Sequence, residues 1–431
     1  MNKYYSAYEN IDLRCYPNYS FDIGDINGDG KKEFISLNQN GNRLRIMDLS
    51  GRLLLEEKLG NNGNWGTPLL CAMDIDSDGR EEAIVPNGKS IAAFDVKGKK
   101  VREIFFESVK KDDFGIAVPL LGKARILSPD EPSLIAAVSG GTISAYDKNF
   151  KQIWKTDGFR NDFGHEIHFA DIDGDGLDEI AFCTADHIGG RHDENNFGEL
   201  VLLDHDGSVL LKKRVDAIYP DTHFDDIAMA DFLGTGTCQI LLEKGILLDL
   251  DGSIIWDISK QFDHGQWIAH TPNPAGKGEL CFISEEWNTE HKSMLFTGGG
   301  KKIKDIKDFP WVKIDAKKYK GSGIRLLPTR CHAIKWSPES EAEFFLSQQV
   351  CINTSHECFS TINFRLNSIF IDLRGNFLGE LPFDDSQIEG YYYNGEVHSK
   401  VADVDGDGMQ EIVYPKQNGR VMVIKKQKDN I

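Results

Sequence analysis

The 431-residue sequence has no long uninterrupted apolar run, and its opening residues, MNKYYSAYEN, contain no apolar core. A membrane-spanning helix needs about 20 predominantly apolar residues, and a secretory signal needs an apolar segment of about 7–15. Basic residues are also scarce, since 49 Lys and Arg stand against 68 Asp and Glu, giving a net charge of −19. We therefore expect a cytoplasmic protein whose partner is neither a membrane nor a nucleic acid.

Disulfide spacing, helical periodicity and the common nucleotide motifs are missing as well. The eight cysteines are scattered, several within apolar runs, which is typical of buried free thiols in a reducing compartment. No segment has a helical period, and there is no P-loop, dinucleotide-binding glycine motif or Ser-His-Asp order. Linker-like runs of Pro, Ser or charge are absent too. We expect a single domain over residues 1–431.

The chain does contain one unit repeated eight times. Each unit has an apolar run followed by two further runs joined by an Asp- or Gly-rich turn. Alternating and β-branched runs of this kind predict strands and hairpins. The hairpins are predicted at residues 43–57, 90–104, 142–156, 199–213, 245–258, 293–306 and 368–381, and the last copy, 419–427, stops before its final strand.

Eight units in this length give roughly 50 residues each, which is the scale of a four-stranded propeller blade. The sequence therefore predicts an all-β, eight-bladed β-propeller, with a seven-bladed ring as the alternative. The truncated last unit lacks one strand, and residues 4–14 are expected to supply it. This pairing would close the ring and remove its exposed edges.

Four units carry an intact acidic loop after their first strand. Alternate residues of a tight turn point inward, so their oxygens converge at the distance that a hard cation requires. The final acid stands at position nine and not at position twelve as in an EF-hand. We predict calcium as a cofactor that staples hairpins at the rim. The predicted ligands are Asp25, Asn27, Asp29 and Glu33; Asp74, Asp76, Asp78 and Glu82; Asp171, Asp173, Asp175 and Glu179; and Asp403, Asp405, Asp407 and Glu411.

Candidate functional residues gather in segments expected on the face opposite the acidic loops. Loops that follow scaffold strands commonly carry function, and the mouth of a propeller is a natural pocket. A single histidine there is more often a packed or hydrogen-bonded residue than a catalyst, so the clustering is what indicates a site. A zinc site at His165, His168 and His223 is a weaker hypothesis, because residues i and i+3 of a strand point to opposite faces. The candidates are His165, His168, His187, His192, His223, His264, His270, His398, Arg191, Asp225, Asp226, Glu285, Glu286, Tyr391, Tyr392 and Tyr393.

Units four to six contain HEIHFADIDGDGLDEIAF, LLDHDGSVLLKK and DHGQWIAHTPNPAGKGELCFISEEW. In this order they resemble the propeller of the rhamnogalacturonan lyases of polysaccharide lyase family eleven. That family has an acidic calcium loop, an Asp-x-Asp-Gly hairpin and a His-Gly-Asp-x-x-His segment that leads to an acidic pair. Here Gln266 replaces the Asp, and the spacing from His264 to His270 is one residue longer.

The resemblance implies β-elimination beside a uronic acid, with an acidic oligosaccharide or polysaccharide of rhamnose and uronate as partner. Such a reaction requires neutralisation of the carboxylate, a base for the C5 proton and an acid for the departing oxygen. The resemblance gives His264 or His168 as base, Arg191 as neutraliser and Tyr392, among three adjacent tyrosines, as proton donor. Two alternatives remain: a non-catalytic glycan- or protein-binding propeller, and a glycoside hydrolase using Asp225 or Asp226 with Glu285. Substrate-binding roles fall to His165, His187, His192, His223, His270, Glu285 and His398.

Overall fold

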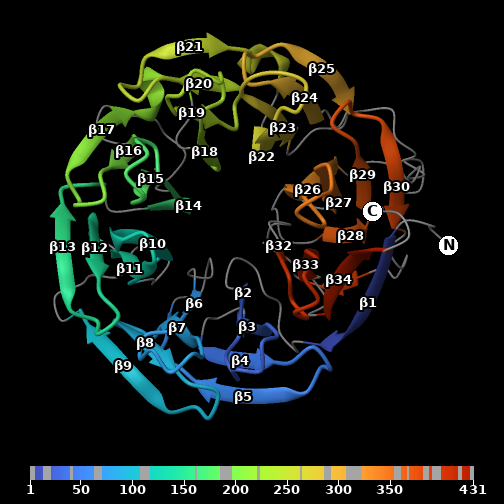
Figure 1. Ribbon diagram of the computed structural model, residues 1–431. Coiled ribbons are helices and arrows are strands. Elements are labelled where there is room, and N and C mark those ends of the chain that lie inside the picture. Colours follow the sequence, from blue (N-terminus) through green and yellow to red (C-terminus); the bar gives the residue numbers. More distant parts are fainter. Residues whose placement is uncertain are drawn as a thin grey trace.

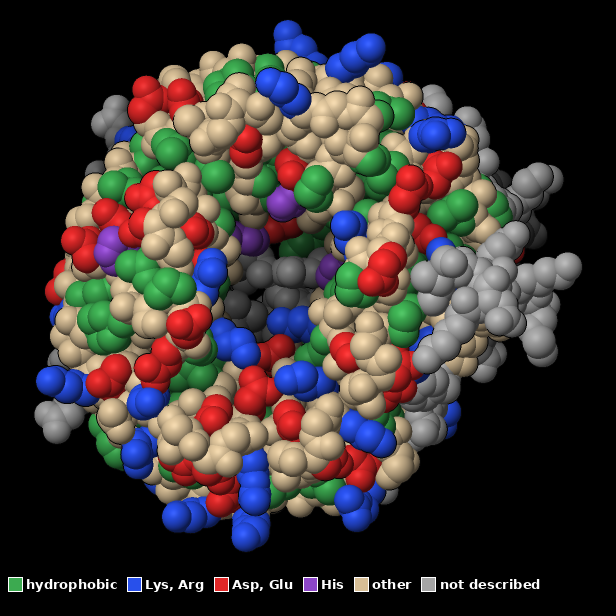
Figure 2. All heavy atoms as spheres, in the orientation of Figure 1, with side chains coloured by type: hydrophobic (Ala, Val, Ile, Leu, Met, Phe, Trp, Pro, Cys, Tyr) green, Lys and Arg blue, Asp and Glu red, His purple; other side chains and the backbone are tan. Residues whose placement is uncertain are grey.

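The computed structural model forms an all-β ring of eight sheets around a central hollow (Figures 1 and 2). Among the residues described, no helix is long or apolar enough to cross a membrane; the helical elements are the one-turn segments η1 (Val215–Ala217) and η2 (Ser259–Gln261). The predicted eight-bladed β-propeller is confirmed. The structure describes residues 5–12, 21–38, 42–62, 70–106, 117–138, 140–160, 163–184, 197–220, 224–262, 265–285, 293–306, 323–353, 361–365, 368–381, 388–390, 399–415 and 420–427.

Within the described residues, seven sheets each have four antiparallel strands, which lie side by side from the central hollow to the outer rim (Figure 1). Blades 1 and 2 are β2 (Phe21–Gly24), β3 (Glu33–Leu37), β4 (Arg43–Met47) and β5 (Leu53–Lys58), then β6 (Cys71–Met73), β7 (Glu82–Pro86), β8 (Ser90–Phe94) and β9 (Lys100–Phe105). Blades 3 and 4 are β10 (Leu120–Ser128), β11 (Glu131–Val138), β12 (Thr142–Tyr146) and β13 (Gln152–Asp157), then β14 (Phe163–Ala170), β15 (Glu179–Thr184), β16 (Glu199–Leu203) and β17 (Val209–Arg214). Blades 5 and 6 are β18 (Ile227–Ala230), β19 (Gln239–Leu242), β20 (Ile246–Leu248) and β21 (Ile254–Asp257), then β22 (Gly265–Pro272), β23 (Glu279–Glu285), β24 (Ser293–Thr297) and β25 (Lys302–Ile306).

Blade 7 differs from the repeat because it has six strands. Its first two strands, β26 (Gly323–Ile334) and β27 (Glu343–Asn353), are 12 and 11 residues long and run past the edge of the blade. β27 therefore pairs with β29 at one end and with β28 at the other. The sequence predicted only the hairpin at 368–381 here. The added strands are β28 (Thr361–Arg365) and β31 (Ile388–Gly390), beside the expected β29 (Ser368–Ile371) and β30 (Phe377–Leu381).

The ring is joined where β1 (Tyr5–Asp12) pairs antiparallel with β34 (Arg420–Lys426). β1 is thus the outer strand of blade 8, after β32 (Lys400–Ala402) and β33 (Glu411–Pro415). The Tyr5 hydroxyl donates to Glu343 Oε2 of blade 7 at 2.9 Å, and its ring stacks on Phe370 with centroids 3.8 Å apart. The N-terminal strand therefore completes one blade and contacts the next.

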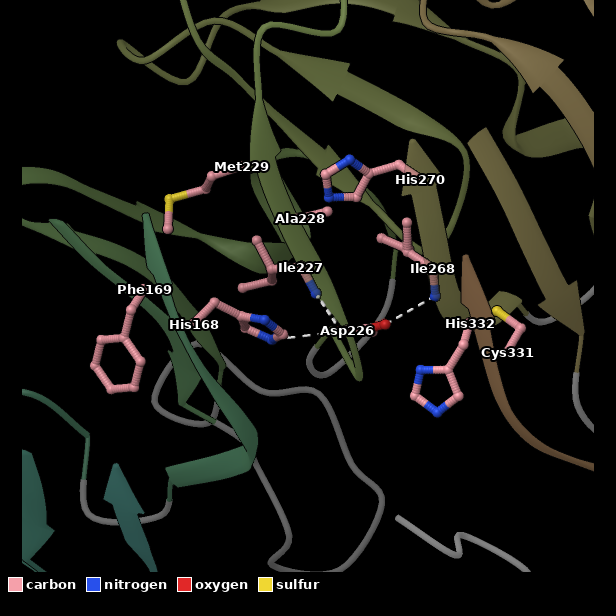
Figure 3. Close-up of a pocket in the computed structure, with 10 residues that line it drawn as sticks. All are labelled: His168, Phe169, Asp226, Ile227, Ala228, Met229, Ile268, His270, Cys331 and His332. Atoms are coloured by element: carbon pink, nitrogen blue, oxygen red, sulfur yellow. Dashed lines mark hydrogen bonds and ion pairs between the residues drawn. The ribbon is translucent and has the colours of Figure 1, made fainter. Parts of the chain in front are cut away.

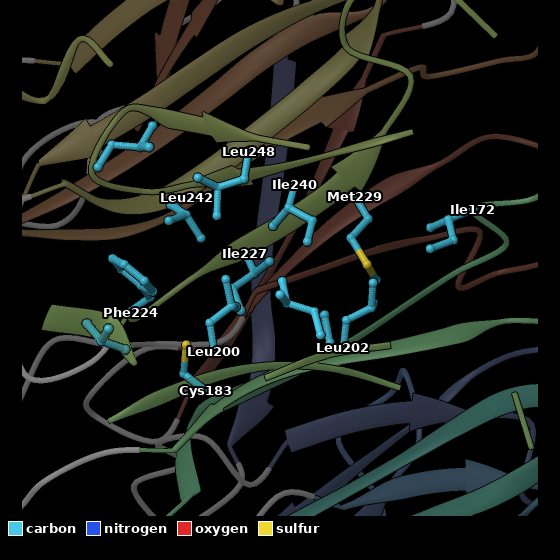
Figure 4. Packing of buried hydrophobic residues seen from close by; sticks show 14 residues of the cluster. Ile172, Cys183, Leu200, Leu202, Phe224, Ile227, Met229, Ile240, Leu242 and Leu248 are labelled. Atoms are coloured by element: carbon cyan, nitrogen blue, oxygen red, sulfur yellow. The ribbon is translucent and has the colours of Figure 1, made fainter. Parts of the chain in front are cut away.

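Apolar side chains fill the spaces between neighbouring blades. The middle strands have both faces covered, so every residue of β15 and β16 is buried, whereas Leu211 is the one buried residue of the outer strand β17. Figure 4 shows this packing between blades 4 and 5, where Leu200 and Leu202 meet Ile227 and Ile240. Burial on both faces explains why the middle strands read as continuous apolar runs. The interface also fixes β14 against β18, which carry the residues described next.

Candidate functional site

The inner strands of blades 4, 6, 7 and 8 share one register. The last residue of each inner strand pairs with the glutamate that begins the second strand: Ala170 with Glu179, Pro272 with Glu279, Ile334 with Glu343 and Ala402 with Glu411. Side chains two residues apart point to the same side of a strand. The position two residues earlier is therefore equivalent in the four blades, and it holds His168, His270, His332 and Lys400.

The three histidines line one cavity of about 230 Å³ on the inner strands of blades 4 to 7 (Figure 3). Asp226, which directly precedes β18, lies among them, and Ile227 and Ile268 are part of the apolar lining. Pockets for drug-sized ligands begin at about 300 Å³. This cavity is therefore large enough for one small cyclic group of a ligand. Polar side chains from four blades converge on it.

His168 and Asp226 form the closest polar pair of the cavity. His168 Nε2 lies 3.4 Å from Asp226 Oδ1. The carboxylate is held by backbone amides, since Ile227 N donates to Oδ1 at 3.0 Å and Ile268 N donates to Oδ2 at 2.8 Å. A neutral imidazole that presents Nε2–H to Asp226 keeps Nδ1 as its basic atom. The pair therefore has the arrangement of a base with an orienting acid.

The other two histidines have their own polar neighbours. His270 Nδ1 lies 3.1 Å from Glu279 Oε2, and His332 Nε2 lies 2.6 Å from Ser399 Oγ. His332 was not among the residues predicted from the sequence. Strand register identifies it: His332 is two residues before Ile334, just as His168 is two residues before Ala170 in blade 4.

A buried charged cluster lies beside Asp226. Lys244 Nζ is 3.1 Å from Glu243 Oε1 and 3.9 Å from Asp225 Oδ2, and all three residues are at most 6% exposed. Asp225 N also donates to Glu243 Oε1 at 3.2 Å. Burial raises the pKa of Glu243 above its ordinary value, and the Lys244 charge opposes that rise. The cluster thus holds the segment before β18 by charge and hydrogen bonding at once.

Two further lysines lie on the inner strands. Lys400 Nζ is 3.4 Å from Asp22 Oδ1, and Lys123 Nζ donates to Ala72 O at 2.7 Å while lying 3.3 Å from Glu81 Oε1. Burial works against the Lys123 charge, but Glu81 and Asp22 raise its pKa overall. Figure 2 shows histidine and basic side chains around the central hollow of this acidic protein. An anionic group entering the hollow would meet cations that the net charge alone does not reveal.

The structure brings together three of the candidates, His168, His270 and Asp226. Both histidines were expected on the face opposite the acidic loops, and that placement is wrong: each belongs to an inner strand, two residues before its loop end. Glu285 ends β23, is 1% exposed and does not line the cavity. The remaining candidates, His187, Arg191, His192, His223, His264, Glu286, Tyr391, Tyr392, Tyr393 and His398, lie outside the described residues, as does the side chain of His165.

The first Asp of each acidic loop organises its turn. In blade 4, Asp171 Oδ1 accepts from Gly174 N at 2.7 Å and Oδ2 accepts from Gly176 N at 3.0 Å. The loops that begin at Asp25, Asp74 and Asp403 repeat this pattern. In each loop, the first Asp thus uses both carboxylate oxygens to accept hydrogen bonds from amides of its own turn.

The last Glu of each loop is buried. Glu33, Glu82, Glu179 and Glu411 are at most 3% exposed, and each accepts an amide hydrogen bond at Oε2. Burial raises the pKa of Glu33, Glu82 and Glu179 to about 7. A bound cation would favour the ionised form. Within the described acidic loops, three groups have ligand atoms within 4.8 Å of one another and could hold a metal: Asp74, Asp76 and Asp78; Asp171, Asp173 and Glu179; and Asp403, Asp405 and Glu411.

The loops of blades 1 and 8 have internal partners for their carboxylates. In blade 1, Asn27 Nδ2 donates to Glu33 Oε1 at 2.7 Å. In blade 8, Lys425 Nζ lies 3.0 Å from Glu411 Oε1 and contacts Asp405. Burial opposes the Lys425 charge, yet hydrogen bonds to Asp405 and Glu411 raise its pKa overall. A lysine ammonium therefore lies where the sequence predicted a calcium ion.

Comparison with known proteins supports the repeat and the fold. Residues 25–85, from the first acidic loop into the second blade, match the FG-GAP-like repeat. No curated protein matches the chain. The architecture defines a β-propeller that has an FG-GAP-like repeat at residues 25–85.

Solved propellers of diverse kinds share this architecture. The rhamnogalacturonan lyase YesW is 18% identical with a TM-score of 0.58, over 97% of this chain and 72% of its own. Sqt1 of Saccharomyces cerevisiae is 10% identical with a TM-score of 0.57, over 99% of this chain and all of its own. BBS1N, solved in complex with ARL6DN, is 8% identical with a TM-score of 0.53, over 99% and 98%. Likeness at these identities establishes the fold alone.

Proposed function

We propose that the hollow binds an acidic oligosaccharide or polysaccharide of rhamnose and uronic acid and cleaves it by β-elimination. The observation that carries this proposal is the His168–Asp226 pair, with its 3.4 Å separation, inside a cavity lined by two further histidines. The structural likeness to a rhamnogalacturonan lyase agrees with the proposal at the level of fold.

The substrate carboxylate needs a positive partner before the neighbouring C5 proton becomes acidic. Lys400 occupies the histidine position in blade 8, and Lys123 lies on the inner strand of blade 3. Both are close to carboxylates of the protein, Asp22 and Glu81, so both are already fixed in place. They are the described residues best suited to neutralise a uronate.

Elimination then requires transfer of one proton in each direction. His168 Nδ1 takes the C5 proton, the electron pair forms a C4–C5 double bond, and the bond from C4 to the glycosidic oxygen breaks. The departing oxygen takes a proton, for which His270, positioned by Glu279, is the donor. Asp226 keeps the His168 ring oriented and stabilises its positive charge after proton uptake.

We also propose calcium as the cation of the acidic loops, where it strengthens the fold. The donor set is oxygen alone in the cluster of blade 2 and in Asp171, Asp173 and Glu179 of blade 4, as calcium prefers. Calcium bound there would offset the repulsion among these carboxylates. The clusters lie at the turns between inner and second strands, and the cluster of blade 4 directly follows β14, which carries His168.

The test is incubation of the protein with rhamnogalacturonan, ulvan and gum-arabic oligosaccharides, followed by ultraviolet absorbance of the unsaturated uronate. The proposal expects new absorbance, and loss of it in His168→Ala. New reducing ends without absorbance would overturn it in favour of a glycoside hydrolase. Binding by calorimetry without any product would overturn it in favour of a non-catalytic binding module.

A further inference from the structure

The hairpin turn of blade 4 places a histidine beside the acidic loop of the same blade. His205 Nδ1 lies 2.8 Å from Asp204 Oδ1 and 3.9 Å from Asp175 Oδ2. One ligand atom each from Glu179, Asp204 and His205 lies within 4.8 Å of the other two. The group combines one nitrogen donor with two carboxylates, unlike the all-oxygen clusters of blades 2 and 8.

Asp204 has different hydrogen-bond partners from the corresponding aspartates of blades 1 and 2. In the equivalent turn of blade 2, Asp95 Oδ1 accepts from the amides of Lys97 and Lys99 at 2.9 and 2.8 Å. Asp48 binds its own turn in the same way in blade 1. In blade 4 a second aspartate, Asp206, accepts from Ser208 N at 2.8 Å. Asp204 Oδ1 accepts only from the next amide in the described turn, His205 N at 2.7 Å, and the carboxylate lies near Glu179 and the His205 ring.

Glu179 supplies an independent sign of a missing ligand. The residue is 1% exposed, and its Oε2 accepts from Ile172 N at 2.8 Å. Its Oε1 is buried and has no hydrogen-bond partner among the residues that the structure describes. A buried carboxylate oxygen without a partner costs free energy, and this one belongs to the residue that meets Asp204 and His205.

Blade 3 holds the turn rigidly. Trp154 Nε1 donates to His205 O at 2.9 Å, and Thr156 Oγ1 donates to Gly207 O at 2.7 Å. Gly207 has a φ of 84°, and a Cβ there would lie 2.6 Å from the Trp154 ring. The donor groups are therefore fixed in place by a neighbouring blade before any ion binds.

We propose that Glu179, Asp204 and His205 form a site for a first-row transition cation of the Zn²⁺ type. Imidazole suits such ions, whereas calcium takes oxygen ligands. Zinc–ligand distances of about 2.0–2.2 Å separate tetrahedral ligand atoms by about 3.3–3.6 Å, so small side-chain shifts are enough. Among the four blades with acidic loops, only blade 4 has histidine after the turn aspartate, where the others have Leu49, Val96 and Lys426.

The experiment is calorimetric titration of the full chain with Zn²⁺ after a chelator has removed calcium, because the proposed calcium loop of blade 4 shares Glu179 with this site. One zinc site is expected to have an affinity at least tenfold weaker in His205→Gln and in Asp204→Asn. Asp249→Asn is the matched control, because Asp249 opens the corresponding Asp-x-Asp-Gly turn of blade 5, where Gln239 replaces the loop glutamate. It should bind zinc as the parent protein does.

Cobalt provides a second readout that needs no variant. Co²⁺ bound to the unmodified protein should give visible absorption bands typical of a low-coordinate site with a nitrogen ligand, and Zn²⁺ should bleach them. The proposal is overturned if His205→Gln binds zinc within twofold of the parent, or if no such bands form. None of these outcomes depends on lyase activity.

Discussion

His168 and Asp226 face each other across the boundary between blades 4 and 5, with Nε2 3.4 Å from Oδ1. Neither blade alone contains the pair, so its geometry depends on the apolar interface shown in Figure 4. Ile268 N of blade 6 adds a hydrogen bond of 2.8 Å to the other carboxylate oxygen. Three consecutive blades thus set the orientation of one imidazole ring.

Asp226→Asn should lower kcat of the proposed elimination by about 10²-fold or more, with little change in KM. The asparagine NH2 can donate to Nε2, which leaves the proton on Nδ1 and removes the base. Steady-state rates from the absorbance of unsaturated product measure the effect. Asp231→Asn, at the other end of β18, is the control and should keep the parent kcat. A rise in KM alone would assign Asp226 to substrate binding and contradict its positioning role.

Glu82→Gln should remove one calcium ion from the protein without unfolding it. Blade 5 provides the precedent, because Asp231 caps an equivalent turn while Gln239 stands in place of the loop glutamate. Calorimetric stoichiometry should fall by one, and the rise in Tm on adding calcium should shrink. The reverse change, Gln239→Glu, should add no site, since Leu233 and Thr235 replace the other loop acids. A stoichiometry unchanged by Glu82→Gln would refute a calcium site in blade 2.

Lys425→Met should make blade 8 dependent on added cation. The variant loses the ammonium that contacts Asp405 and Glu411, so repulsion among the remaining carboxylates is no longer offset. Its Tm in a chelator should fall below that of the parent, and calcium should raise it by more. Lys426→Met is matched to it, because Lys426 pairs with Glu343 of blade 7 and not with the loop. Equal calcium responses in the two variants would show that Lys425 does not substitute for the ion.

The repeat made the fold predictable because every blade needs the same pattern of buried strands and polar turns. The acidic loops were predictable for a similar reason, since their ligands lie within nine consecutive residues. The contact of Lys425 with the acidic loop was not predictable, because this lysine reaches the loop from the third strand. It stands at the position that Asp48, Asp95 and Asp204 occupy in the other blades with acidic loops. Knowledge of strand pairing was needed to align these positions.

His332 escaped prediction for the same physical reason. Blade 7 has lost the acidic loop that marks the end of its inner strand, so the sequence offers no reference for counting back to the histidine position. His168 and His270 were identified as candidate residues, but they were assigned to the wrong face of the propeller. Composition reveals which side chains are present, whereas their convergence depends on register between strands far apart in sequence.

Glu243→Gln should flatten the pH dependence of stability. Burial raises the pKa of Glu243 above its ordinary value of 4.5, so the folded protein retains a proton that the unfolded chain has lost. Its contribution to stability is fully present below pH 4.5 and is lost as pH rises through the folded-state pKa. Tm values measured from pH 4.5 toward neutrality should decline less in the variant than in the parent. Glu341→Gln, an exposed site, should retain the parental slope, and a parental slope in Glu243→Gln would contradict the assignment.

Tyr5 should stabilise the closure of the ring, because it joins the N-terminal strand of blade 8 to blade 7. Tyr5→Phe removes only the hydroxyl that donates to Glu343, so we expect a loss of about 1 kcal/mol in the free energy of unfolding. Tyr5→Ala also removes the ring stacked on Phe370 and should cost about 3–5 kcal/mol. Urea denaturation followed by tryptophan fluorescence separates the two values. Leu53→Ala, at an exposed position on the outer strand of blade 1, is the control and should change stability by about 0.5 kcal/mol or less. If Tyr5→Ala were as mild as this control, β1 would not be needed to hold blade 8 against blade 7.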